Sequence, residues 1–201
     1  MMDRVISISP GNSKMGLIPS VSLPPVVTCA AGVPCAAKCY AAKLCRIYPT
    51  VKNAYARNLE IFQNSPDHYF LQLNAAIAVS RFFRLHVSGD FPTLEYVREV
   101  LRIARNNAHC QIMAFTKRYT WVNALIDAGE EIPENLHIIF SGWGGYAVPN
   151  PHNLPMSQVI FKGESPAENW KVCGGNCAEC ATTCGGCWAL KRGETVAFYE
   201  H

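Results

Sequence analysis

The spacing of apolar residues predicts two helices that follow an irregular first quarter of the chain. Prolines and a glycine-containing turn interrupt residues 1–50. Apolar side chains then recur every three to four positions, first over 51–62 and again over 69–77, as they do on the buried face of a helix. Between these two runs, Ser65 can cap the second helix and Pro66 can occupy its first position.

The rest of the chain alternates between strand-like and helix-like patterns. Thr120 is the expected N-cap of one helix and Gly129 its C-terminal stop. A loop rich in glycine and proline, 142–155, separates the central elements from the last strands. The predicted elements are strands at 83–88, 111–116, 136–141, 159–161 and 195–199, and helices at 94–104 and 121–128.

Alternating strands and helices predict right-handed βαβ units around a parallel sheet. We therefore expect one α/β domain over residues 1–201, with cysteine-rich loops at both chain ends. A partial (β/α) barrel and an open parallel sheet both accommodate five or six parallel strands, and the sequence does not choose between them.

Composition agrees with a globular domain and excludes several classes of protein. Hydrophobic residues make up 49% of the chain and charged residues 16%. The net charge is +3 and no basic stripe is present, so nucleic acid is not indicated as a partner. No apolar run is long enough to cross a membrane, and the apolar stretch at the N-terminus is too short for a signal peptide. We expect a protein of the cytoplasm.

Nine of the ten cysteines form two groups near the chain ends. Grouped cysteines in a reducing cytoplasm bind metal more often than they form disulfides. Glycines within the second group permit the tight backbone that wraps a metal site. Cys110 stands alone at a predicted strand start, where a small core residue is expected. The groups lie in loops 24–46 and 173–188 and comprise Cys29, Cys35, Cys39 and Cys45, and Cys173, Cys177, Cys180, Cys184 and Cys187.

An iron–sulfur cluster is the metal group that we favour, with zinc as the alternative. Gaps of two or three residues between cysteines suit one turning loop that delivers several thiolates to a compact cluster. A zinc ribbon would instead use the two pairs Cys177–Cys180 and Cys184–Cys187. We expect one or two 4Fe-4S clusters, either joining cysteines from both chain ends or using one group each.

Several motifs together resemble the bacteriophage gene product eighty-eight family. The resemblance covers nearly the whole chain. It implies a phage origin and action in the cytoplasm of the bacterial host, and it implies no particular reaction. The motifs are Gly11-Asn12-Ser13-Lys14-Met15-Gly16, the run Cys29-x5-Cys35-x3-Cys39-Tyr40-Ala41, the segment from Arg84 to Pro92, Ala114-Phe115-Thr116-Lys117 and Cys187-Trp188.

A more distant similarity is to radical S-adenosylmethionine (SAM) enzymes, which fold as partial (β/α) barrels. The similarity implies that Cys29, Cys35 and Cys39 hold a 4Fe-4S cluster whose open iron takes up SAM. It also implies that Val87-Ser88-Gly89-Asp90, at the end of a strand, contacts the SAM amino group. The cysteine spacing typical of that superfamily occurs here at 173–180 instead.

Further site residues are expected at the carboxyl ends of the strands, where ligands bind to parallel sheets. Alternation along strand 83–88 would place three polar side chains on one face, lining a cavity or meeting a cluster. They would simply be solvated if this strand lies at an edge. Asp90 is either a carboxylate for an amine or a helix cap, and Lys117 either faces an anion or is solvated. The candidates are Arg84, His86, Ser88, Gly89, Asp90 and Lys117.

Three functions remain open from the sequence. The first is an iron–sulfur protein, with or without enzyme activity, that carries out redox, sulfur-transfer or small-ligand chemistry at its cluster. The second is an electron-transfer module that serves a redox partner and has no substrate. The third is a zinc-stabilised phage protein that binds nucleic acid or a host partner.

Overall fold

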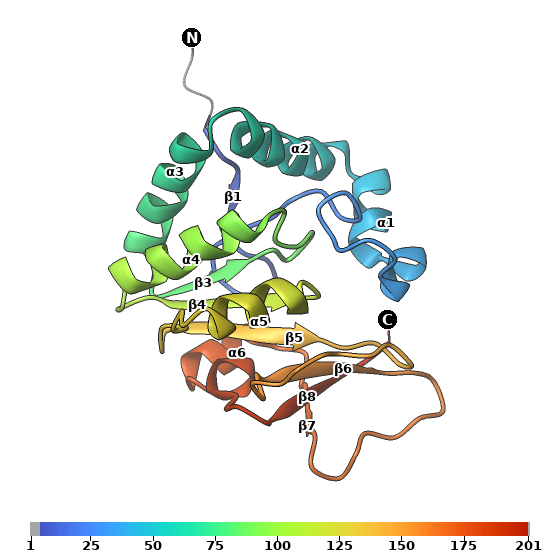
Figure 1. Cartoon of the computed structure of the whole chain (residues 1–201). Coiled ribbons are helices and arrows are strands. Elements are labelled where there is room, and N and C mark those ends of the chain that lie inside the picture. Colours follow the sequence, from blue (N-terminus) through green and yellow to red (C-terminus); the bar gives the residue numbers. More distant parts are fainter. Residues whose placement is uncertain (1–4, 201) are drawn as a thin grey trace.

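The computed structural model describes residues 5–200 and contains an open sheet with helices packed against it (Figure 1). Its eight strands follow the order β1-β2-β3-β4-β5-β6-β8-β7. Only β1 and β2 pair antiparallel, and every other neighbouring pair is parallel. The α/β prediction is therefore confirmed as an open, mostly parallel sheet, and the alternative of a partial barrel is wrong.

The elements have the following bounds in the described residues. The strands are β1 (Ile8–Ser9), β2 (Ser20–Val21), β3 (Phe82–Leu85), β4 (Gln111–Thr116), β5 (Leu136–Ser141), β6 (Met156–Ile160), β7 (Lys171–Val172) and β8 (Thr195–Tyr199). The helices are α1 (Tyr40–Ile47), α2 (Pro49–Asn64), α3 (Pro66–Ala78), α4 (Leu94–Asn106), α5 (Tyr119–Asp127), α6 (Cys177–Thr182) and the 3-10 helices η1 (Pro34–Lys38) and η2 (Gly186–Ala189).

The two faces of the sheet have separate hydrophobic cores because side chains alternate along each strand. On β3, Phe83 and Leu85 join the larger core that α2 to α5 cover. Phe82 joins a smaller core on the opposite face, with Trp188 from the cysteine-rich C-terminal segment. Figure 1 shows α6 across the sheet from α4 and α5. The C-terminal cysteine segment, which includes α6, thus covers the sheet face opposite α4 and α5.

The central strands and long helices agree closely with the sequence prediction. β4 and β5 have the predicted bounds. Pro66 is the first residue of α3 and Ser65 its N-cap, although the Ser65 side chain makes no capping hydrogen bond. Gly129 follows α5 with a left-handed φ of +89°. The predicted N-cap at Thr120 is wrong, because α5 already begins at Tyr119.

Residues 5–50 are less irregular than predicted. They contain α1, η1 and the short strands β1 and β2. β2 pairs with β3 and so extends the parallel sheet by one strand. Cys29, Cys35 and Cys39 lie in the connection that runs from β2 through η1 to α1, and Cys45 lies in α1. The segment that carries these cysteines therefore starts at a strand of the sheet.

Two late crossovers contain no helix in the structure. The β5–β6 connection runs through residues 142–155 and the β6–β7 connection through 161–170, both as turns and extended chain. Helices α2 to α5 cover one face of the central strands. Over β6, the loops of these two connections take their place.

Candidate metal centres

Four of the five C-terminal cysteines gather beneath the sheet, and we call Cys173, Cys177, Cys180 and Cys187 the four-thiol group. All four side chains pack against the smaller core. The pKa of Cys187 is raised to about 12, chiefly by burial and in addition by charge repulsion from the other three thiols. The pKa of Cys180 is raised in the same way, by burial and then by Cys177 and Cys173. Cys180 and Cys187 therefore each lie within electrostatic reach of the other three thiols.

The short helix α6 and local hydrogen bonds position three of these thiols. Cys177 and Cys180 lie one turn apart on α6 and so share a face. The Asn176 side chain caps that helix by accepting from the Glu179 backbone N–H at 3.2 Å. The thiol of Cys173 accepts a backbone N–H from Gly175 at 3.3 Å. Such N–H···S contacts stabilise a sulfur that carries negative charge.

The N-terminal Gly-Asn-Ser-Lys turn supports this group from the other end of the chain. The Lys14 carbonyl accepts the backbone N–H of Cys177 at 3.0 Å. Gly16 has a φ of +63°, and a Cβ there would lie 2.6 Å from the Cβ of Ala178. The turn therefore packs directly against the start of α6, which gives this motif a structural role that its sequence did not reveal.

Cys184 lies outside the four-thiol group. Its side chain is exposed, its φ is +49°, and its Sγ lies 4.0 Å from a guanidinium nitrogen of Arg81. The structure thus brings Cys173 into the group in place of Cys184. The zinc-ribbon pairing of Cys177–Cys180 with Cys184–Cys187 would require the exposed Cys184 side chain to turn toward the other three thiols.

Arg84 brings a positive charge to the four-thiol group from the middle of β3. Its Nη1 lies 3.9 Å from Cys177 Sγ, and its Cζ lies 5.1 Å from the ring centroid of Phe115. The guanidinium lowers the pKa of Cys187 against the effect of burial. Its Nε is buried and has no hydrogen-bond partner among residues 5–200. Because buried charges are normally paired, this guanidinium fits a neighbour that carries negative charge.

Gly186 is required for the packing of these thiols. It has a φ of +57°, and a Cβ there would overlap Cys180 Sγ. We expect Gly186→Ala to displace Cys180; under the hypothesis that each cysteine group holds metal, it should lower the metal content of the purified protein by about half. The matched control is Gly193→Ala, because Gly193 has a φ of +81° but no atom within 4 Å of the added Cβ.

Backbone strain alone should cost the control about 1–2 kcal/mol of stability without loss of metal. Metal content by elemental analysis, together with the thermal midpoint, separates the two effects. Equal metal loss in both variants would show that strain, rather than contact with Cys180, is responsible.

The N-terminal cysteines form a second group, and we call Cys29, Cys35 and Cys39 the three-thiol group. The pKa of Cys29 is raised to about 11, chiefly by burial and to a smaller extent by the charges of Asp90, Cys35 and Cys39. η1 holds Cys35, and Cys39 follows it as the N-cap of α1. Cys45 interacts electrostatically with Cys39, so α1 carries a fourth sulfur beside this group.

The three-thiol group is anchored at the carboxyl ends of β3 and β4. Arg118 donates to the backbone carbonyls of Thr28 and Cys29 at 2.7 and 3.0 Å. The Tyr40 hydroxyl, next to Cys39, donates to the Val87 carbonyl at 2.6 Å. Figure 1 shows α1 on the side toward which β3 and β5 point. This is the edge at which open α/β sheets bind ligands.

Asp90 is a buried cross-link at this edge. Its carboxylate accepts from the Thr116 hydroxyl at 2.6 Å and from the Lys117 backbone N–H at 2.8 Å. Burial raises the pKa of Asp90, and these hydrogen bonds oppose the rise. The alternative that Asp90 caps the next helix is wrong, because Thr93 accepts from the Tyr96 backbone N–H and caps α4.

His86 does not share a face with Arg84, so the predicted alternation is wrong at this point. β3 ends at Leu85, and His86 has a φ of +56°. Its ring therefore turns to the helix-covered core, where Nε2 lies 3.1 Å from the Tyr96 hydroxyl. Burial lowers the pKa of His86 to about 3. His86 is accordingly a neutral core residue.

The other predicted residues have packing partners. Ser88 donates to the Leu23 carbonyl at 3.1 Å. Gly89 has a φ of +81°, and a Cβ there would lie 2.8 Å from the same carbonyl oxygen. Lys117 Nζ donates to Ser141 Oγ at 2.6 Å, so this lysine is held at the sheet edge.

Cys110 is fully buried in the larger core, and burial raises its pKa to about 12. Its expected role as a core residue is confirmed. Sequence reasoning missed Arg118, whose guanidinium holds the three-thiol loop. The available signal was a cation two residues after a predicted strand, but the partners of Arg118 are backbone carbonyls that no side-chain pattern reveals.

The fold and these two groups define an open-sheet α/β protein with one cysteine cluster at its carboxyl edge and another beneath the sheet. The chain belongs to the phage protein family described as Gene product 88, whose model matches residues 7–194. The family resemblance drawn from the motifs is thereby confirmed.

The remaining comparisons add no relatives. No curated protein and no solved structure matches the chain, and nothing in them supports the similarity to radical SAM enzymes. Among the described residues, no helix is long and apolar enough to span a membrane. Within residues 5–200, no set of three or more His, Cys, Asp or Glu side chains is arranged to hold a single metal ion.

Proposed function

We propose that this phage protein is an iron–sulfur protein with two 4Fe-4S clusters, one on each thiol group. The observation that carries the proposal is that four partly buried thiols pack against one core beside Arg84, whose Nη1 lies 3.9 Å from Cys177 Sγ and whose Nε has no partner in the described chain. Thiolates are the protein ligands of iron–sulfur clusters. A cluster with four thiolates carries negative charge, which the guanidinium would offset.

The two groups suit different tasks. The four-thiol group can supply every iron of its cluster with a protein ligand, which is typical of electron transfer. The three-thiol group leaves one iron open to a small ligand, with Cys45 as a competing fourth ligand. Its place at the carboxyl edge of the sheet favours ligand chemistry there. SAM is one candidate ligand, and inorganic sulfide is another.

Metal analysis of the full chain tests this proposal. Protein purified without air should be brown, with a broad charge-transfer absorption. It should contain about eight irons and about eight acid-labile sulfides per chain, as two 4Fe-4S clusters require. A colourless protein that holds zinc would contradict the proposal and favour a zinc-stabilised binding protein.

A further inference from the structure

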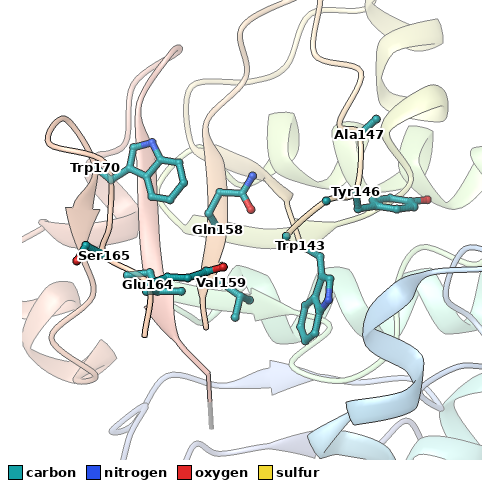
Figure 2. A pocket seen from close by; sticks show the side chains of 11 residues that line it. Trp143, Tyr146, Ala147, Gln158, Val159, Glu164, Ser165 and Trp170 are labelled. Atoms are coloured by element: carbon teal, nitrogen blue, oxygen red, sulfur yellow. The ribbon is translucent and has the colours of Figure 1, made fainter. Parts of the chain in front are cut away.

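A groove of about 590 Å³ lies over β6, apart from both thiol groups (Figure 2). It exists because the connections on either side of β6 contain no helix to cover this part of the sheet. Gln158, Val159 and Ile160 of β6 form the floor of the groove. The loops that carry Trp143 and Trp170 form its walls. The volume lies in the range of small-molecule sites, about 300–1,000 Å³.

The Trp143 wall is held in place by close packing. The rings of Trp143 and Phe161 meet edge to face with their centroids 5.3 Å apart. A Cβ on Gly142 would lie 2.5 Å from the carboxamide of Gln158, and one on Gly144 would overlap the Phe161 ring. Glycine at both positions therefore lets the loop lie directly on β6, so this aromatic wall is preformed.

Gln158 supplies the polar contact of the groove. Figure 2 shows its carboxamide between the indoles of Trp170 and Trp143. No hydrogen bond of this carboxamide to any residue within 5–200 is present, so both its donor and its acceptor are available. A carboxamide can pair with two adjacent polar atoms on the edge of a planar ring, as glutamine does with adenine.

The charge of the groove disfavours an anionic ligand. Of the described residues that line it, none is Lys, Arg or His, and Glu164 is the sole acidic one. Lys38 approaches Phe161 from the three-thiol loop, but its Nζ is already paired with Glu200 at 2.7 Å. A phosphate group would therefore find no free cation here.

We infer that this groove is a binding site for a neutral nucleoside, whose base stacks on the tryptophans and pairs with Gln158. Stacking on an aromatic side chain uses the face of the base, and the carboxamide reads its edge. A base could come from a free nucleoside or from single-stranded nucleic acid, and the lack of cations favours the free nucleoside. The inference is independent of which metal the cysteines bind.

Isothermal titration of the anaerobically purified full chain with adenosine tests the site. Adenosine should bind, and Trp170→Ala should weaken binding about tenfold or more, as the loss of one stacking partner does. Gln158→Leu, which keeps the size of the side chain, should weaken binding as well. The matched control is Trp121→Phe, because Trp121 lies on α5 and stacks with Arg118 instead; it should leave the affinity unchanged.

Three further ligands identify the source of the base. Adenosine 5′-monophosphate should bind no more tightly than adenosine, and methyl glucoside should not bind. A short oligodeoxyadenylate should gain no salt-dependent affinity over adenosine. The inference is overturned if adenosine fails to bind, if the sugar binds in its place, if the oligonucleotide binds more tightly, or if Trp121→Phe weakens binding as much as Trp170→Ala.

Discussion

Cys180→Ser should remove about half of the iron from the protein, while Cys184→Ser should leave the iron content unchanged. Cys180 lies among the four thiols and touches Gly186, whereas Cys184 is exposed and faces Arg81. Serine is a poor ligand for cluster iron because its hydroxyl is far less acidic and less soft than a thiol. A cluster held by four protein thiolates should therefore be lost or become labile when one of them is replaced.

Iron and acid-labile sulfide per chain, measured after anaerobic purification, check this expectation. The two cysteines lie four positions apart in the same segment, so Cys184→Ser controls for general damage to that segment. Circular dichroism of both variants should retain the wild-type helix and strand content, since the larger core lies on the other face of the sheet. Equal iron loss in both variants, or none in Cys180→Ser, would contradict the assignment of the four-thiol group.

Cys39→Ala should remove the other half of the iron, while Cys110→Ala should retain all of it. Cys39 lies next to Cys29 and Cys35 at the carboxyl edge, and Cys110 is enclosed in apolar side chains. Removing one of three thiolates leaves too few ligands to hold a 4Fe-4S cluster firmly. Cys110→Ala should lower the free energy of unfolding by about 1 kcal/mol through lost packing.

The paramagnetic resonance spectrum of the reduced protein shows which of the two proposed clusters a variant has lost, and total iron content does not. Cys39→Ala and Cys180→Ser should each keep one of two cluster signals, and the double variant should lose both. If either single substitution removed all iron, one cluster would have to join both chain ends. If Cys110→Ala lost as much iron as Cys39→Ala, the three-thiol group would not be the site.

The central sheet was predictable because its strands are short runs that are apolar on both faces. β4 and β5 are buried by helices on one side and by the cysteine segment on the other, so their bounds follow from apolar content alone. β1 and β2 have two residues each, too few to show any periodicity. α1 escaped prediction because it has only eight residues and buries only Ala41, so it offers too short a buried face for its periodicity to stand out.

The choice among cysteines could not come from spacing. Cys173 and Cys184 fit the dense C-terminal run equally well, and what separates them is backbone conformation. A positive φ at Cys184 and the reversal at Gly185-Gly186 turn one thiol outward and bring Cys187 back toward Cys180. His86 shows the same effect on β3, because one left-handed residue ends the alternation that placed it beside Arg84.

Arg84 is the candidate for which the sequence left two interpretations open. On an internal strand it was expected to line a cavity or meet a cluster, and on an edge strand to be solvated. The structure pairs β3 with both β2 and β4 and places Arg84 Nη1 3.9 Å from Cys177 Sγ. The charge of Arg84 also reaches Tyr40, whose hydroxyl pKa it lowers against the effect of burial. Arg84 is therefore electrostatically linked both to the four-thiol group and to the residue that follows Cys39.

The most direct test is an anaerobic crystal structure with anomalous data collected at the iron and zinc edges. Two iron peaks should appear, one enclosed by the sulfurs of Cys173, Cys177, Cys180 and Cys187 and one beside those of Cys29, Cys35 and Cys39. Zinc at either position, or thiols without any metal, would contradict the central claim.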